Sequence, residues 1–149
     1  ADLSALKIGY YSYEYEHSGD DFLPLIERAV QAPLWVLATP LYWYTMSAQA
    51  KTFVDRLSDL LHHRKELGRA LRGKRLAVIC GGTDPTAPPH FDEPFALTAK
   101  YLGMGYEGSI YARFNGRELV EPGFSERAAE FRARLLGGAS AESAPDARR

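Results

Sequence analysis

Apolar positions recur along this chain with two periods, and these periods predict its elements. Four segments have apolar residues at every third or fourth position, as amphipathic helices do: 22–30, 48–61, 90–102 and 124–136. Three shorter segments are apolar runs or alternate between two sides, as strands do: 34–38, 75–80 and 105–114. Helices and strands take turns, and this order predicts an α/β fold with a doubly wound parallel sheet and helices on both faces.

The strand predicted at 34–38 leads into a loop rich in aromatic residues. Pro40 ends the strand, and Ser47 can act as the N-cap of the following helix. Between them lie Tyr42, Trp43 and Tyr44. Because ligands of open α/β sheets bind outside the carboxyl ends of the strands, aromatic residues at such an end indicate a flat ligand.

The strand predicted at 75–80 also ends in a short loop. Gly81, Gly82 and Thr83 form it, and glycines there allow the backbone to approach a ligand closely, although Gly-Gly after a strand also makes an ordinary turn. Cys80 precedes the loop. The sequence places no base beside it, so we expect a buried structural thiol rather than a nucleophile.

The two ends of the chain have weaker patterns. Tyrosines alternate with polar residues near the end of the segment 1–15, which predicts either a half-buried strand or an extended loop. These tyrosines would pack a surface segment or line a ligand or dimer pocket. Residues 137–149 are small and polar, so we expect a disordered tail after one domain that spans residues 1–136.

Composition narrows the classes of function. The 149 residues carry a net charge of −1, so neither nucleic acid nor a membrane is expected as a partner. No apolar run approaches the roughly 20 residues of a membrane span. The single cysteine excludes an intramolecular disulfide and fits a reducing cytoplasm. His62 and His63 lack the spacing that places two ligands on one helix face, so no metal site is expected.

The block from Pro40 to Arg56 carries a specific resemblance. It reads PLYWYTMSAQAKTFVDR: a strand ending in Pro-x-Tyr, a short loop, Ser-Ala, and then Lys-x-x-x-Asp-Arg. This block resembles the signature of the flavodoxin-like NAD(P)H-dependent FMN reductases and NAD(P)H:quinone oxidoreductases. The pair Asp20-Asp21, which opens a helix, and the loop 80–83 also resemble that family.

The resemblance implies a flavodoxin-like sheet of strand order 2-1-3-4-5 that binds FMN at the carboxyl ends of its strands. Residues of two loops would contact the flavin: Pro40, Leu41, Tyr42, Trp43, Tyr44, Thr45, Cys80, Gly81, Gly82 and Thr83. Backbone N–H groups of the first loop would reach the ring edge. Hydride would pass from NAD(P)H through the flavin N5 to a quinone or a similar small-molecule electron acceptor. No catalytic acid or base is expected.

The resemblance also assigns supporting roles. Lys51, Asp55 and Arg56 would fix their helix and the neighbouring loops. A second subunit, in a homodimer or higher homo-oligomer, would complete the flavin face. The segment 10–15 and the pair His90-Phe91 are the expected contributors.

The chain departs from the family pattern near its N-terminus. The Ser/Thr- and Gly-rich phosphate loop that should follow the first strand is absent from residues 1–17, so the N-terminal βα unit is expected to be missing. Either the chain is a fragment, or it is a degenerate relative that repairs the gap by association. No cysteine between Gly9 and Asp20 could hold the iron–sulfur cluster of some relatives. Two other functions stay open: a flavodoxin-type electron carrier and a flavin-free interaction protein.

Overall fold

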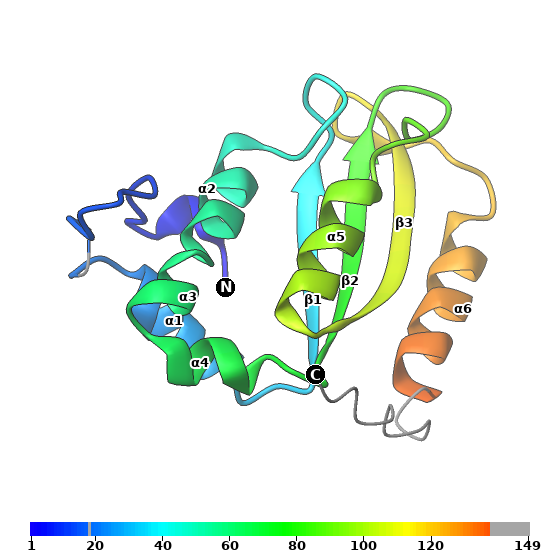
Figure 1. Ribbon diagram of the computed structural model, residues 1–149. Coiled ribbons are helices and arrows are strands. Elements are labelled where there is room, and N and C mark those ends of the chain that lie inside the picture. The colour runs from blue at the N-terminus through cyan, green and yellow to red at the C-terminus, as the bar shows by residue number, and fades with distance from the viewer. Residues whose placement is uncertain (18, 138–149) are drawn as a thin grey trace.

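The computed structural model describes residues 1–17 and 19–137, and a four-stranded sheet lies at its centre (Figure 1). The strands lie side by side in chain order: β1 (Leu34–Pro40), β2 (Arg75–Gly82), β3 (Gly105–Asn115) and β4 (Glu118–Leu119). The first three run parallel, which confirms the predicted α/β sheet. The short β4 pairs antiparallel with β3 and makes the sheet mixed. Two residues are too few to produce a periodic pattern, so the sequence did not predict β4.

The described residues also form six α-helices and one 3₁₀ turn: η1 (Leu3–Ala5), α1 (Phe22–Ala29), α2 (Ala48–Arg56), α3 (Asp59–His62), α4 (Lys65–Ala70), α5 (Glu93–Leu102) and α6 (Phe124–Gly137). The helix predicted at 48–61 is in fact two helices, because the chain turns between Arg56 and Asp59. The segment 1–15 forms η1 and a loop rather than a strand. Apart from Gly137, which ends α6, the predicted tail lies outside the described residues.

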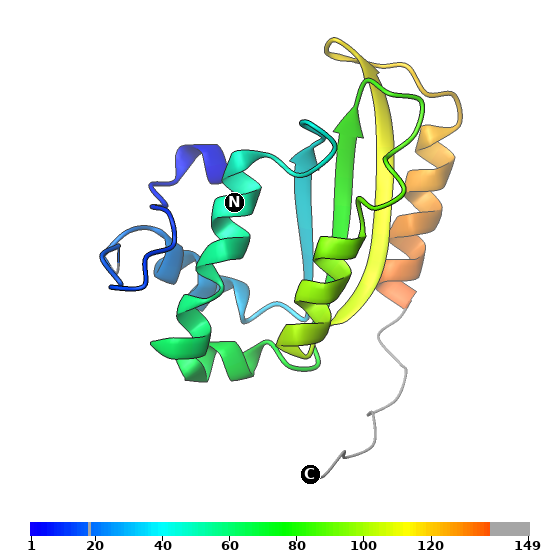
Figure 2. The ribbon, with the colours of Figure 1, turned by 45° about the horizontal axis from the view of Figure 1, so that its top comes forward.

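The two faces of the sheet carry different helices (Figure 2). On one face the β2 residues Leu76, Val78 and Cys80 pack in the core with residues of α5, including Phe95 and Ala99. On the other face α6 lies beside β3. Helices therefore lie on both faces, as predicted.

The outer edge of β1 has no neighbouring strand among the described residues. Helices α1 and α2 and the turn η1 lie beyond this edge (Figures 1 and 2). Between them and β1 runs a cleft of about 750 Å³, with apolar walls that include Leu25, Trp35 and Phe53. The unpaired backbone edge and this cleft agree with the expected lack of an N-terminal βα unit within residues 1–17.

Candidate functional site

The structure brings the two predicted loops together at the carboxyl ends of β1 and β2. Pro40 lies opposite Gly81 in the parallel register of the two strands. Just beyond it, the Leu41 N–H donates to the Gly81 carbonyl over 2.7 Å. Both loops therefore lie at one end of the sheet, where open α/β sheets bind their ligands.

Residues 42–45 form a tight turn, called here the aromatic turn. The Tyr42 N–H donates to the Thr45 carbonyl over 2.9 Å, and the Thr45 N–H donates to the Tyr42 carbonyl over 3.1 Å. The two central residues have positive φ angles, 49° at Trp43 and 68° at Tyr44. Reciprocal hydrogen bonds around two left-handed residues are the pattern of a type I′ turn.

The aromatic turn presents its side chains to solvent. The exposed fractions are 60% for Tyr42, 92% for Trp43 and 69% for Tyr44. Within the described chain, the N–H groups of Trp43 and Tyr44 have no recorded hydrogen-bond partner, whereas those of Leu41, Tyr42 and Thr45 are used internally. The set of N–H groups able to reach a ring edge is therefore narrower than the resemblance implied.

The start of α2 fixes the far side of this loop. Ser47 caps the helix as predicted, because its Oγ accepts from the Ala50 N–H over 3.3 Å. The Ser47 N–H itself donates to Oγ1 of Thr39, the residue before Pro40, over 2.9 Å. These bonds tie α2 to the end of β1 and close the base of the aromatic turn.

Gly81 and Gly82 are glycines for a reason internal to the protein. A Cβ on Gly81 would lie 2.9 Å from the Phe114 ring, and one on Gly82 would lie 2.7 Å from the Tyr111 hydroxyl and 3.1 Å from the Leu41 Cβ. The protein itself therefore occupies the space that a side chain would need. This packing alone explains both glycines, so they are not evidence that a ligand approaches the backbone closely here.

Cys80 is buried, as predicted. Its side chain is 1% exposed, and burial raises the pKa of its thiol to about 11, with a further contribution from the negative charge of Asp92. The group is therefore a neutral thiol at pH 7. It lies in the core, so at most its backbone can take part in ligand binding, whereas Thr83 at the end of the loop is exposed.

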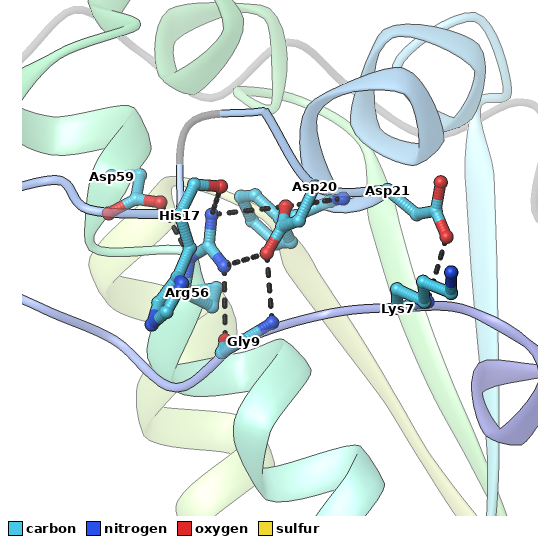
Figure 3. Close-up of polar contacts among 8 residues, drawn as sticks. Lys7, Gly9, His17, Asp20, Asp21, Arg56 and Asp59 are labelled. Atoms are coloured by element: carbon cyan, nitrogen blue, oxygen red, sulfur yellow. Dashed lines mark hydrogen bonds and ion pairs between the residues drawn. The ribbon is translucent and has the colours of Figure 1, made fainter.

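A buried ionic network anchors the opposite end of α2 (Figure 3). Arg56, 1% exposed, donates through Nη1 to Asp20 Oδ2 over 2.5 Å and through Nε to Asp59 Oδ2 over 2.7 Å. Its guanidinium also donates to the carbonyls of Gly9 (3.0 Å) and His17 (3.3 Å). These contacts confirm that Arg56 fixes its helix and a neighbouring loop.

The two aspartates that open α1 hold the N-terminal segment (Figure 3). Asp20 Oδ2 accepts from the Gly9 N–H over 2.8 Å, and Asp21 Oδ2 accepts from the Lys7 N–H over 2.7 Å. Burial by itself raises the pKa of Asp20, but the hydrogen bonds from Arg56, Gly9 and Phe22 outweigh it and lower this pKa. The sequence marked both aspartates as a helix start, but nothing local could pair Asp20 with an arginine 36 residues away.

Lys51 and Asp55 behave differently from Arg56. Their charged atoms lie 2.5 Å apart at the i, i+4 spacing, as predicted, but the two side chains are 58% and 44% exposed. They form a solvated ion pair on the surface of α2. They hold no neighbouring loop in place.

The cleft along β1 meets the aromatic turn at one end. Pro40, Tyr42 and Ser47 are among the residues that line it. Asp2 carries the one charged side chain of the described lining. Exposed aromatic rings and free N–H groups suit a flat heteroaromatic ring such as a flavin. The cleft itself offers no basic side chain for a phosphate.

Residues 1–17 and 19–137 contain neither a metal-binding cluster nor a membrane-spanning helix. No three His, Cys, Asp or Glu side chains lie close enough together to hold a metal ion. None of the described helices has the length and apolar character needed to span a membrane.

Comparison with known families decides the class of protein. The family model of NADPH-dependent FMN reductases matches residues 1–88, which is more than half of the chain. The chain belongs to this family. The match covers β1, the aromatic turn, the Arg56 network and the 80–83 loop, and it confirms the resemblance based on the block from Pro40 to Arg56.

Individual relatives agree with this assignment. YwqN of Bacillus subtilis, a candidate NAD(P)H-dependent FMN-containing oxidoreductase, is 30% identical over 100 residues, 64% of this chain and 55% of YwqN. The chain thus spans about half the length of this relative. The solved Trp repressor binding protein of Bacillus subtilis is 25% identical with a TM-score of 0.63, over 78% of this chain and 71% of that one.

A third relative supports the fold alone. An FMN-dependent NADH-azoreductase from Bacillus anthracis, solved in complex with FMN, is 12% identical with a TM-score of 0.59. The alignment covers 91% of this chain and 77% of the azoreductase. The flavodoxin-like fold class predicted from the sequence is therefore confirmed.

Proposed function

We propose that this chain carries the ring-binding part of an FMN-dependent NAD(P)H oxidoreductase, which passes electrons from a nicotinamide to a quinone or a similar flat acceptor. The observation that supports this function most directly is the aromatic turn at the carboxyl end of β1, in a chain of the FMN reductase family. The azoreductase neighbour, whose fold is similar, was solved with FMN bound. FMN, when bound, supplies the hydride chemistry.

Residues of both loops would contact the isoalloxazine ring of FMN. The free N–H groups of Trp43 and Tyr44 would donate to the polar edge of the isoalloxazine. The exposed face of Tyr42, at the mouth of the cleft, would lie against the ring. Thr83 would offer a hydroxyl from the second loop. None of these groups needs to take or give a proton, which agrees with a site that lacks a reactive thiol.

We extend the proposal to a homodimer or higher homo-oligomer whose second subunit covers the flavin. Tyr10 and Tyr13 are 79% and 86% exposed on a loop that the Arg56 network holds in place, so they are available to a partner. In the pair His90-Phe91, the Phe91 ring is 4% exposed and packs in the core, which leaves His90 as the available residue.

Titration of the purified chain with FMN, followed by flavin fluorescence and calorimetry, tests this function. Binding with flavin absorbance that is bleached by NADPH, and restored by a naphthoquinone, is the expected result. Tyr42→Ala should weaken FMN binding at least tenfold. Tyr101→Ala is the matched control, because Tyr101 is 76% exposed near the C-terminal end of α5, which leads to the amino end of β3.

A flavin-free interaction protein is the second candidate function. The lack of a basic side chain in the cleft favours it, because nothing there would hold the FMN phosphate. A chain that neither binds FMN nor is stabilised by it, at flavin concentrations up to the millimolar range, would support this second function against the first.

A further inference from the structure

Residues 9–17 form a loop, called here the tyrosine loop, whose two ends are joined by Arg56 (Figure 3). The guanidinium donates from Nη1 to the Gly9 carbonyl over 3.0 Å and from Nη2 to the His17 carbonyl over 3.3 Å. The His17 ring also lies against Gly9, because a Cβ on Gly9 would be 2.5 Å from it. Compact loops of about 6–16 residues with closed ends, known as Ω-loops, are frequently functional.

Aromatic contacts order the tyrosine loop between its ends. The Tyr15 ring stacks on His63, the residue after α3, with 4.1 Å between ring centroids. Tyr11 and Tyr13 meet edge to face, with 5.1 Å between their centroids. A loop that is ordered before it binds a partner loses less conformational entropy on binding. The tyrosine loop is therefore built to present its exposed side chains to another molecule.

The side chains that the tyrosine loop exposes are aromatic and acidic. Tyr10 and Tyr13 are 79% and 86% exposed, and Glu14 and Glu16 are exposed as well. Within residues 1–17 and 19–137, neither carboxylate has an ion-pair partner. The loop contains no lysine and no arginine. Carboxylates next to tyrosine rings favour a guanidinium, which pairs with the acid and can lie over the ring.

Two exposed arginines lie at the end of the sheet that carries the candidate site. Arg113 is opposite Gly82 in the register of β2 and β3, and Arg117 lies in the turn between β3 and β4. In the part of the chain that the structure describes, no ion pair involves either guanidinium. Glu118 is the one acid among residues 113–120, so this surface is basic overall.

We infer that the tyrosine loop of one copy of the chain docks on Arg113 and Arg117 of a second copy and covers the flavin site there. Glu14 and Glu16 would pair with the two guanidiniums, and the exposed tyrosines would lie over the site. This inference rests on the proposed function and names the two surfaces that meet in its homo-oligomer. Each copy carries both surfaces, so a two-fold axis would form the contact twice.

A second basic surface offers a matched control. Lys65, Arg69 and Arg72 are exposed on α4 and just after it, and none of them has an ion-pair partner among the described residues. They precede β2, so they lie toward the amino ends of the strands. A tyrosine loop bound there would leave the flavin site uncovered.

Charge reversal followed by sedimentation velocity of the FMN-loaded chain tests the docking. Glu14→Arg with Glu16→Arg should weaken self-association at least about tenfold, and so should Arg113→Glu with Arg117→Glu. The variant with all four changes exchanges the two charges, so its association should return to within about threefold of the wild type. A wild type that stays monomeric at millimolar concentration, or a fourfold variant without recovery, would overturn the inference.

The control variant decides between the two basic surfaces. Arg69→Glu with Arg72→Glu should leave self-association unchanged. If this pair, rather than the pair at Arg113 and Arg117, restores association to the charge-reversed tyrosine loop, the loop docks on α4 and the inference is wrong. Iodide should quench bound FMN at least about twofold more in the variant with the charge-reversed loop, because its flavin is uncovered. Equal quenching in wild type and variant would refute the cover.

The design also separates the inference from the proposed function. If the wild type does not bind FMN, the proposed function fails, whatever the sedimentation shows. If FMN binds and is bleached by NADPH while reversal at Glu14 and Glu16 leaves both association and quenching unchanged, the function stands and the docking of the tyrosine loop fails.

Discussion

At its N-terminal end α2 follows a turn whose aromatic side chains are mostly exposed, whereas at its C-terminal end the guanidinium of Arg56 donates from Nε, Nη1 and Nη2 to groups of the fold. Trp43 is 92% exposed in a left-handed conformation, and Arg56 is 1% exposed between two aspartates. One end is strained and open, and the other is satisfied and closed. The difference separates a region to which the proposed function assigns a ligand from a region whose contacts lie within the fold.

Removal of Arg56 should have the largest effect on folding. Arg56→Ala would leave the buried Asp59 and the partly buried Asp20 without their counter-charge, so we expect a loss of about 3–5 kcal/mol in the free energy of unfolding. Urea denaturation measures this loss. A loss under about 1 kcal/mol would mean that the network is a surface feature and that the comparison between the two ends of α2 is wrong.

Acid should weaken the same end of α2 through Asp20. The pKa of Asp20 is lower in the folded state than in the unfolded chain, where it is about 3.9. The contribution of this carboxylate is therefore complete above pH 4 and is lost as the pH falls through the lower, folded-state pKa. Melting temperatures of the wild type and Asp20→Asn between pH 2 and 6 measure this contribution. The melting temperature of the variant should fall less on acidification than that of the wild type. An equal fall in the two proteins would contradict the role of Asp20.

Relief of strain before the N-terminal end of α2 should raise the free energy of unfolding, by less than Arg56→Ala lowers it. Tyr44→Gly removes a Cβ from a residue with φ 68°, so we expect a gain of about 1 kcal/mol, or roughly 2–4 °C in melting temperature. Gly116→Ala is the matched reverse change. It adds a Cβ at φ 60° in open space and should cost about 1 kcal/mol. Two shifts of the same sign would show that the aromatic turn is not strained.

The exposed ion pair between Lys51 and Asp55 should contribute least to the free energy of unfolding. Lys51→Ala removes an ion pair whose side chains are 58% and 44% exposed, so the free energy of unfolding should change by no more than about 0.5 kcal/mol. Denaturation at low and high salt measures this change. A larger loss of unfolding free energy that does not depend on salt would show that Lys51, like Arg56, helps to hold the fold together.

Much of the fold could be predicted from local pattern. The apolar runs at 34–38 and 75–80 became β1 and β2, and helical spacing located α1, α5 and α6. The break between α2 and α3 was missed, because the apolar spacing continues across it while Asp59 turns back to meet Arg56. Ser47 was predicted as a cap, since a capping bond involves residues only three positions apart.

The candidate site was predicted in part. The sequence placed both loops at one end of the sheet, and the register of Pro40 with Gly81 bears this out. It could not indicate that the Phe114 ring and the Tyr111 hydroxyl leave no room for side chains at Gly81 and Gly82, because those contacts come from β3, a strand distant in the sequence.

By itself the sequence determined the alternation of the main helices and strands, the family and the aromatic character of the loop after β1, because periodicity, capping and motif spacing are local properties. Only the tertiary structure decided the pairing of Arg56 with Asp20, the cleft along β1, and the left-handed turn at Trp43 and Tyr44. A turn built without glycine or asparagine contradicts local preference. The bonds that flank it, from the Ser47 N–H to Thr39 Oγ1 and from the Leu41 N–H to the Gly81 carbonyl, join segments that meet only once the chain has folded.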